Sequence, residues 1–209
     1  MESMAKGLFV TLEGGEGVGK STLARGLHDA LRTSKREIVL TREPGGSTGA
    51  DEIRALLLRG EPGRWSATEE ALLYSAARAH HLRETILPAL ARGALVICDR
   101  YYDSTRAYQI AAGGLDPAVL DALNALIEAP APDLTLILDL DPSAGVSRSQ
   151  GARAGEDRFE RKGADYHARV RAAFRDIAAS WTQRCVLIDA SQSPAAVLAA
   201  ALAAIEAKL

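Results

Sequence analysis

Residues 14–21 read Gly-Gly-Glu-Gly-Val-Gly-Lys-Ser and constrain the fold of this chain more than any other stretch. They match the phosphate-loop pattern of Gly, four residues, Gly-Lys and then Ser or Thr. Residues 8–13, just upstream, form a short apolar run with the length of a buried strand, and residues 22–32 carry leucines at helical spacing. Strand, glycine-rich turn and helix thus follow in the order that the motif requires. We therefore predict an anion-binding loop at a helix N-terminus rather than an ordinary glycine-rich turn.

Composition excludes several other classes of protein. The chain has 209 residues, 25% charged and 47% hydrophobic, which suits a single soluble domain over residues 1–209. A net charge of −2 gives no basic field for a nucleic acid polymer. No apolar run is long enough to cross a membrane, and residues 1–6 lack the apolar core of a signal peptide. Cys98 and Cys185, both in apolar runs, are interpreted as buried, reduced thiols of a cytoplasmic protein.

Five short runs rich in Val, Ile and Leu predict strands that are buried between helices. Helical stretches separate them, and this alternation predicts an α/β fold with a parallel sheet flanked by helices, in three layers. Ligands of such sheets bind at the carboxyl ends of the strands. The runs are residues 8–13, 37–42, 94–99, 134–140 and 184–189, and polar residues gather where they end, at Glu13, Arg42, Glu43, Asp99, Arg100, Asp139 and Asp189.

The loop after the second predicted strand holds Arg42, Glu43 and Pro44, followed by two glycines. Proline fixes one backbone angle, and glycine permits close approach of a ligand. We interpret this loop as one wall of an acceptor site, with Arg42 and Glu43 facing inwards. A solvent-exposed connection is the alternative.

A helix predicted over residues 67–92 carries Tyr74 and Arg78, which are four residues apart and so share one face. An aromatic ring with a guanidinium one turn away can stack on a flat heterocycle and bond its edge. On the residues alone, a tyrosine at the core edge and a surface arginine is the simpler interpretation.

Asp99 and Arg100 end the third predicted strand, beside the phosphate loop. Asp99 is placed to hold Mg²⁺ together with the Ser21 hydroxyl, and Arg100 can clamp a second phosphate group. A structural ion pair is the alternative for this Asp–Arg pair. Asp139, at the end of the fourth strand, competes for the metal, and the sequence does not decide between the two carboxylates.

Residues 147–163 form the most charged part of the chain, with glycines at positions 151 and 155. A charge run is usually solvated surface, but these arginines lie on a segment that glycines allow to open and close. Phosphoryl transfer requires positive charge on the migrating group, and a lid also excludes water from the donor. We interpret the segment as such a lid.

Taken together, these segments resemble the thymidylate kinase family of P-loop nucleoside monophosphate kinases. The resemblance covers nearly the whole chain and implies a P-loop NTPase fold, with ATP and dTMP as substrates and Mg²⁺ as cofactor. It implies transfer of the ATP γ-phosphoryl group to dTMP, giving dTDP for dTTP synthesis, in a homodimer. The matching residues are Glu16 to Ser21 in the phosphate loop, 42–46 (Arg-Glu-Pro-Gly-Gly), 99–101 (Asp-Arg-Tyr), Ser104, Thr105, 107–109 (Ala-Tyr-Gln) and 157–160 (Asp-Arg-Phe-Glu).

The resemblance also implies roles for single residues. Glu16 would orient the acceptor sugar and phosphates, and Arg100 would grip the dTMP phosphate. Tyr74 would stack on thymine while Arg78 bonds its edge, and Tyr108 would crowd the 2′ position of the sugar against ribonucleotides. For ATP we expect Gly14, Gly15, Glu16, Gly17, Val18, Gly19, Lys20, Ser21, Thr22 and Arg148, and for dTMP we expect Arg42, Glu43, Pro44, Tyr74, Arg78, Arg100, Ser104, Thr105, Tyr108, Gln109, Phe159 and Glu160.

We expect Glu16, Lys20 and Arg100 to be catalytic, together with an arginine from the lid. The phosphate loop has no arginine of its own, and the transferred phosphoryl group needs additional positive charge. Arg153 is the first choice, followed by Arg148 and Arg158, which resembles the bacterial branch of the family.

The chain departs from the family pattern in three places. After Gln109 it has Ile110, Ala111 and Ala112 where the family tends towards a glycine run. Tyr74 stands where phenylalanine is more usual, and Arg106 where a neutral side chain is expected. A kinase for another nucleotide or nucleoside remains an alternative, as does an ATP-binding subunit without catalytic activity. A GTP-dependent switch is not favoured, since no Asn-Lys-x-Asp segment follows an apolar strand.

Overall fold

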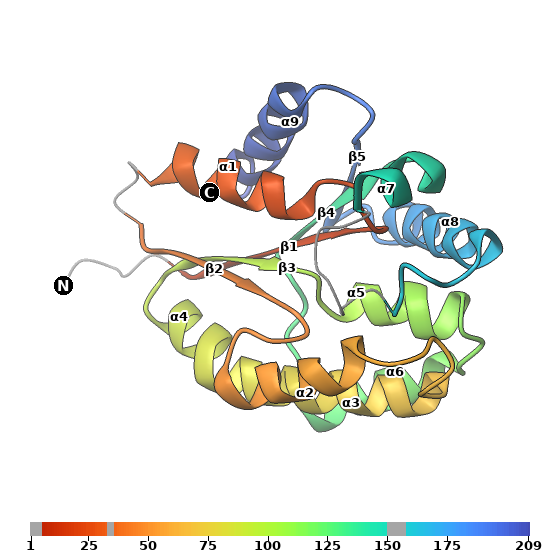
Figure 1. Cartoon of the computed structure of the whole chain (residues 1–209). Helices are drawn as coiled ribbons and strands as arrows, with labels where there is room; N and C mark the ends of the chain where they lie inside the picture. Colours follow the sequence, from red (N-terminus) through yellow and green to blue (C-terminus); the bar gives the residue numbers. More distant parts are fainter. Residues whose placement is uncertain (1–5, 33–35, 150–157) are drawn as a thin grey trace.

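The sheet that the sequence predicts is present in the computed structural model, which describes residues 6–32, 36–149 and 158–209. In these residues five parallel strands form one sheet in the order β2-β3-β1-β4-β5 (Figure 1). Each strand begins and ends within one residue of its predicted bounds. The strands are β1 (Leu8–Gly14), β2 (Ile38–Arg42), β3 (Leu95–Asp99), β4 (Leu134–Asp139) and β5 (Cys185–Asp189).

Helices connect the strands throughout the described part of the chain. The helix predicted over residues 67–92 is continuous, but a π-helical turn, η1, divides it into α3 and α4. The helices are α1 (Lys20–Leu31), α2 (Thr48–Leu58), α3 (Ala67–His81), η1 (Leu82–Ile86), α4 (Leu87–Ala91), α5 (Tyr102–Thr105), η2 (Arg106–Ala111), α6 (Pro117–Leu126), α7 (Pro142–Ser149), α8 (Ala164–Ser180) and α9 (Pro194–Glu206).

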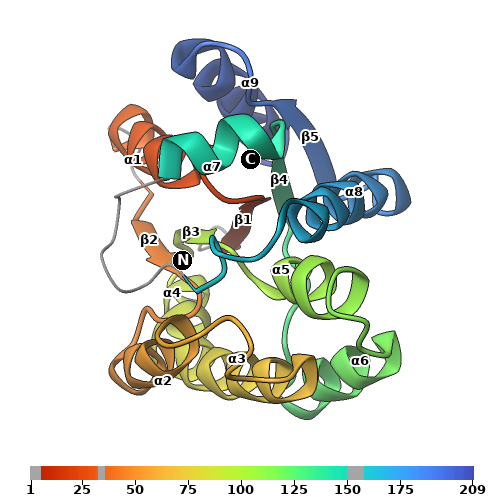
Figure 2. The same ribbon diagram turned by 45° about the vertical axis from the view of Figure 1, so that its right-hand side comes forward.

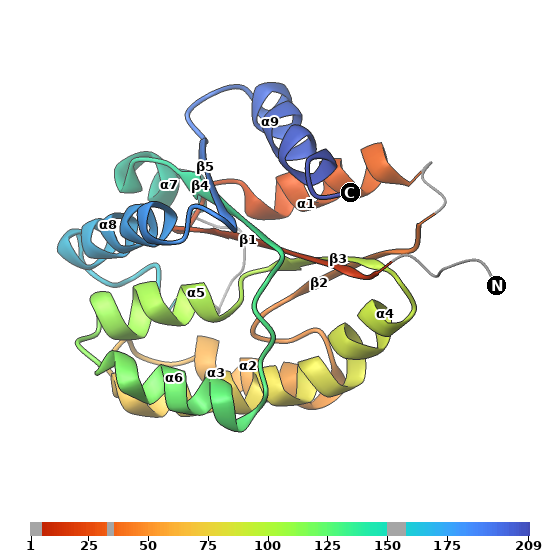
Figure 3. The same ribbon diagram turned by 180° about the vertical axis from the view of Figure 1, so that it is seen from behind.

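The helices cover both faces of the sheet, which gives the three layers of a doubly wound fold (Figures 1 and 3). On one face, α1 and α9 pack together and enclose a cluster that includes Leu12, Leu27 and Ile205. On the other face, η1 and α4 enclose Phe9 and Val96, and α8 packs on β4 and β5. The three inner strands are covered on both faces, and most of their side chains are therefore apolar; Thr11, Glu13 and Thr135 are the buried polar exceptions.

Strand register brings the future site residues to one edge of the sheet. Asp99 at the end of β3 pairs with Leu12 of β1 and with Arg42 of β2. The phosphate loop leaves β1 at this edge, and α7 lies close beside it: a side chain at Gly17 would collide with the backbone of Gly145 (Figure 2). The positive φ of Gly17, 66°, is a second reason for glycine there.

Capping residues fix the ends of several helices. Ser66 and Glu69 form a capping box at the start of α3, and the side chain of Asp116 caps α6. The Ser193 hydroxyl accepts a hydrogen bond from the backbone of Ala196 and so caps α9.

Both cysteines, Cys98 and Cys185, are buried free thiols, as expected from their apolar surroundings. Among the described residues, none of the helices combines the length and the apolar character needed to cross a membrane.

Candidate active site

A cleft of about 1300 Å³ opens at the carboxyl edge of the sheet. Its walls come from the phosphate loop, the loop after β2, α3, the end of β3, η2 and residues 159–160, while residues 190–198 border its other end. The described side chains that the sequence predicted for nucleotide, metal or acceptor line this cleft, except for Asp139, the competing metal ligand. Of the predicted glycines, Gly14 and Gly15 lie outside its lining, at the base of the loop.

The phosphate loop turns into α1 at Gly19, whose left-handed backbone (φ 99°) only glycine adopts without strain. Lys20 folds back over the loop, and its Nζ donates to the carbonyls of Gly14 at 3.1 Å and Gly15 at 2.7 Å. Burial and the nearby charge of Arg100 lower the pKa of Lys20 to about 8. The loop therefore holds an ammonium group that an anion in the cleft would stabilise.

Arg100 reaches across from β3 to the same loop. Its Nη1 donates to the Gly14 carbonyl at 2.8 Å, and its Nη2 donates to Glu16 Oε1 at 2.9 Å. Tyr108 Oη donates to that same carboxylate oxygen at 2.8 Å. Burial alone would raise the pKa of Glu16, but Arg100, Lys20 and the Tyr108 hydrogen bond outweigh it and lower the pKa to about 2. Glu16 is thus a fixed anion that orients a cation and a phenol at the acceptor end.

The backbone of Arg100 is itself unusual, with a positive φ of 70° in a residue that is not glycine. This conformation costs energy and persists only where the surroundings hold it. Glu13 is one such support, because it accepts hydrogen bonds from the Tyr101 backbone at 2.8 Å and from Ser104 Oγ at 2.6 Å. Burial and the charge of Asp103 raise the pKa of Glu13 to about 8.

Arg78 is the most deeply buried arginine that faces the cleft, at 1% exposure. Its Nε donates to Glu43 Oε2 at 2.8 Å and its Nη2 donates to Thr105 Oγ1 at 3.3 Å, while His81 holds the second Glu43 oxygen. The remaining nitrogen, Nη1, is buried and has no hydrogen-bond partner within the described residues. A buried donor without a partner is costly, so this nitrogen is available to a ligand.

Three of the aromatic rings that line the cleft lie close together. The ring of Phe159 lies 6.4 Å from that of Tyr74 and 5.9 Å from that of Tyr108. All three side chains line the cleft. The Phe159 ring plane is tilted by 53° against that of Tyr74 and by 85° against that of Tyr108, so the rings form apolar walls against which the flat face of a nucleobase can pack.

Arg42 lies at the outer wall, where its side chain is 49% exposed and its Nη2 is 3.8 Å from Asp51 Oδ1. Glu43 also borders the cleft, but its carboxylate contacts Arg78 and His81. The loop after β2 therefore contributes one accessible cation, and Glu43 acts through Arg78.

The two carboxylates that competed for a metal differ in their partners. Ser21 Oγ donates to Asp99 Oδ2 at 3.0 Å, so a hydroxyl and a carboxylate lie together at the mouth of the phosphate loop. Asp139 is instead held by Arg171 and Arg175, and its hydrogen bond with Arg171 lowers its pKa. Oxygen ligands of this kind suit Mg²⁺, which binds through one or two protein groups plus phosphates. The fit favours Ser21 and Asp99.

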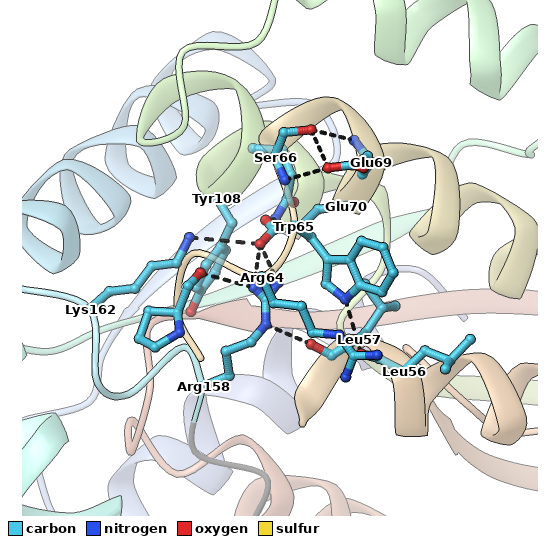
Figure 4. A network of polar contacts seen from close by, with 12 residues as sticks. Leu56, Leu57, Arg64, Trp65, Ser66, Glu69, Glu70, Tyr108, Arg158 and Lys162 are labelled. Atoms are coloured by element: carbon cyan, nitrogen blue, oxygen red, sulfur yellow. Dashed lines mark hydrogen bonds and ion pairs between the residues drawn. The ribbon is translucent and has the colours of Figure 1, made fainter. Parts of the chain in front are cut away.

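The lid arginines have different outcomes. Arg153 lies outside the described residues, as do glycines 151 and 155, and the side chain of Arg148 is not described. Arg158 is fully buried and paired with Glu70 through both Nη atoms (Figure 4). Arg158 was the third choice for the mobile catalytic arginine. Its burial argues against that role, because moving it would leave the buried Glu70 carboxylate without its cation.

Arg106, which departs from the family pattern, makes two structural contacts. It pairs with Asp121 of α6 at 2.6 Å and lies over the Trp181 ring at 5.1 Å. Three buried groups near the cleft were not predicted: Glu13 as a support of Arg100, His81 as a partner of Glu43, and Glu70 as a partner of Arg158. Glu70 lies one turn before Tyr74 on α3, but nothing in the sequence indicates that a charged residue there is buried.

A phosphate loop on a five-stranded parallel sheet, facing a second set of cations across a cleft, defines a class of phosphotransferases that act on nucleotides. The thymidylate kinase family model matches residues 12–201. A thymidylate kinase of Ruegeria pomeroyi is 50% identical over 193 residues, which cover 92% of each chain. One of Caulobacter vibrioides is 48% identical over 198 residues, or 94% of this chain and 95% of the relative.

Structural comparison agrees with the sequences. A crystal structure of thymidylate kinase from Ehrlichia chaffeensis matches with a TM-score of 0.79 and 31% identity, covering 96% of this chain and 99% of that one. The chain belongs to the thymidylate kinase family, whose members are ATP-dependent nucleoside monophosphate kinases.

Proposed function

We propose that this chain transfers the γ-phosphoryl group of ATP to the 5′-phosphate of dTMP, giving dTDP. The family supports this activity, and a kinase for a different nucleotide or nucleoside is not favoured. Arg78 carries the assignment of the base. It is buried, its orientation is fixed by Glu43 and Thr105, and Nη1 has no hydrogen-bond partner among the described residues. That nitrogen can donate to O4 of thymine, whereas cytosine carries an amino group at the same position.

Gln109 completes the recognition of the base edge. Its side chain is 1% exposed and lines the same cleft as Arg78. If Arg78 donates to O4 of thymine, Gln109 would lie beside the N3–H of the base. Tyr74 and Phe159 would then pack against the thymine ring. A thymine in this position makes one donor and one acceptor contact, and the methyl group requires only space.

The phosphates meet between the two ends of the cleft. Lys20 and the loop amides bind the ATP phosphates, while Arg100 and Arg42 bind the dTMP phosphate. Ser21 and Asp99 would hold Mg²⁺, which family members generally use with ATP. When bound, that ion would neutralise charge on the donor phosphates.

Catalysis then depends on position and charge. The acceptor phosphate is already ionised near pH 7, because its second pKa is about 6, so no general base is needed. Glu16 fixes Arg100 and Tyr108, and the family resemblance implies that Tyr108 would crowd the 2′-hydroxyl of a ribonucleotide. Arg153 of the lid supplies positive charge to the migrating group and closes the site against water.

The proposal is tested by measuring ATP consumption with dTMP, dUMP, dCMP and UMP as acceptors. We expect dTDP formation with dTMP, weaker use of dUMP and little use of dCMP or UMP. ATP hydrolysis that is independent of dTMP, or equal use of all four acceptors, would contradict it.

We further propose that the enzyme is a cytoplasmic homodimer, as the family resemblance implies. Its buried free thiols suit a reducing compartment. The helices α2, α3 and α6 lie together on one side of the molecule (Figure 1). They expose Leu56, Leu72 and Leu126, whose exposed fractions are 45%, 51% and 79%. Exposed apolar side chains on adjacent helices are consistent with a subunit contact there.

A further inference from the structure

The side chain of Gln109 is hydrogen-bonded to Glu70, a residue that does not line the cleft. Its Nε2 donates to Glu70 Oε2 at 2.7 Å, and Glu70 is 2% exposed. A carboxylate paired with a guanidinium only accepts hydrogen bonds, so the amide nitrogen of Gln109, and not its oxygen, must face Glu70. The opposite end of the amide, Oε1, is therefore the part that Gln109 offers to the cleft.

Glu70 is itself held in one orientation. Arg158 donates to Glu70 Oε1 through both Nη atoms and to the Leu57 carbonyl through Nε at 2.9 Å (Figure 4). Lys162 Nζ lies 3.8 Å from the same carboxylate oxygen. One oxygen of Glu70 is thus committed to cations and the other to Gln109, so neither the carboxylate nor the amide can turn without losing a buried bond.

The two cleft-facing groups now have fixed and opposite characters. Arg78 can only donate, and Gln109 presents an acceptor. Thymine and uracil offer the complement, an acceptor O4 beside a donor N3–H. Cytosine offers a donor N4–H₂ beside an acceptor N3, and so opposes both groups.

We propose that Glu70, from behind the wall of the cleft, determines the preference for thymine-type over cytosine-type bases by fixing the amide of Gln109 with its oxygen toward the substrate. Glu70 is a positioning residue, because it acts only through Gln109. This inference rests on the base assignment proposed above and adds a residue that does not touch the substrate.

Glu70→Gln tests it through a reversal. Arg158 would donate to the oxygen of the new amide at position 70, so the nitrogen of that amide would face Gln109. The Gln109 oxygen would then turn toward position 70 to accept from it, and Gln109 Nε2 would face the cleft. We expect kcat/KM for dTMP and dUMP to fall together by about tenfold, and that for dCMP to rise severalfold. The dTMP-to-dCMP preference would then fall by the product of the two changes, several tens of fold, and the dTMP-to-dUMP ratio would stay unchanged.

Arg158→Lys is the matched control, because it weakens the same buried pair but leaves the Glu70 carboxylate and its bond to Gln109. We expect a lower Tm with an unchanged base preference. If Glu70→Gln does not fold, the double variant Glu70→Gln with Arg158→Met removes the stranded guanidinium. It leaves the Gln109 amide free to adopt either orientation, and the preference should fall by about tenfold.

A folded Glu70→Gln enzyme with the wild-type dTMP-to-dCMP preference would overturn the proposal. So would a change in the dTMP-to-dUMP ratio of the same size, which indicates general distortion of the site, or an equal loss of preference in Arg158→Lys. A wild-type enzyme that uses dCMP as well as dTMP would instead refute the base assignment itself. The acceptor assay of the wild type therefore comes first and separates this failure from a failure of the Glu70 proposal.

Discussion

Lys20 shows how a single side chain couples substrate binding to protons. Burial, followed by the charge of Arg100, lowers its pKa to about 8. Phosphates of a bound nucleotide would replace the carbonyls that Lys20 now contacts and would favour its charged form. The pKa must then rise on binding, so nucleotide affinity should decrease as pH rises above about 8.

The measurement is isothermal titration calorimetry of ATP at about pH 8.5 in buffers that differ in ionisation enthalpy. We expect proton uptake on binding in the wild type and none in Lys20→Met. Uptake that persists in Lys20→Met would assign the proton to another group.

Glu13 predicts a pH dependence of stability. Its pKa in the folded protein, about 8, is above the ordinary 4.5, so the folded state retains a proton that the unfolded state loses between these values. The favourable contribution of Glu13 is therefore full below about pH 4.5 and is lost as pH rises through about 8. Glutamine has no proton to lose and can keep the contacts to Tyr101 and Ser104.

Glu13→Gln should therefore gain stability relative to wild type as pH rises, by an amount on the order of a few kcal/mol between about pH 5 and about pH 9. Urea unfolding at both pH values measures the difference. A gap between the two proteins that does not change with pH would contradict a raised pKa for Glu13.

At the scale of elements, local signals in the sequence predicted what local physics determines. Each strand is a short run rich in apolar residues, although the edge strands β2 and β5 are partly exposed, and the phosphate loop needs glycine where φ is positive. Both features can be predicted from residue types. The sequence did not predict that Arg158 is buried, because its partner Glu70 lies 88 residues away in the chain. Only the packing of residues 158–162 against α3 brings the two together. The amide orientation of Gln109 has the same origin, as does the support that Glu13 gives to Arg100.

Two arginines of residues 147–163, Arg153 and Arg158, should have different effects when they are substituted. Arg153→Ala should lower kcat by about a hundredfold or more with an unchanged Tm, because it removes charge only from the transition state. Arg158→Lys should lower the Tm and change kcat far less, because its side chain is buried with Glu70. Steady-state kinetics and thermal unfolding of both variants check this contrast, and a Tm loss in Arg153→Ala with normal kcat would reverse the assignment.

At the scale of the molecule, the edge of one sheet organises both substrates. The phosphate loop leaves β1, the loop with Arg42 leaves β2 and Arg100 leaves β3, so three strand ends converge on one cleft. The face of the molecule formed by α2, α3 and α6 is separate from the side where α1 and α9 lie (Figure 3). A subunit contact on that face would include α3, the helix that carries Tyr74 and Arg78.

Association through this face would therefore stabilise α3, and with it Tyr74 and Arg78, as well as joining the subunits. We expect a mass near twice the 22.2 kDa of one chain in sedimentation equilibrium. Leu72→Glu, at a half-exposed position on α3, should shift the mass toward that of one chain, because burying a carboxylate without a partner is costly. Leu209→Glu is the matched control, since Leu209 is also exposed but ends the chain beyond α9. A Leu72→Glu protein that sediments like wild type would place the contact elsewhere, and a monomeric wild type would refute the dimer.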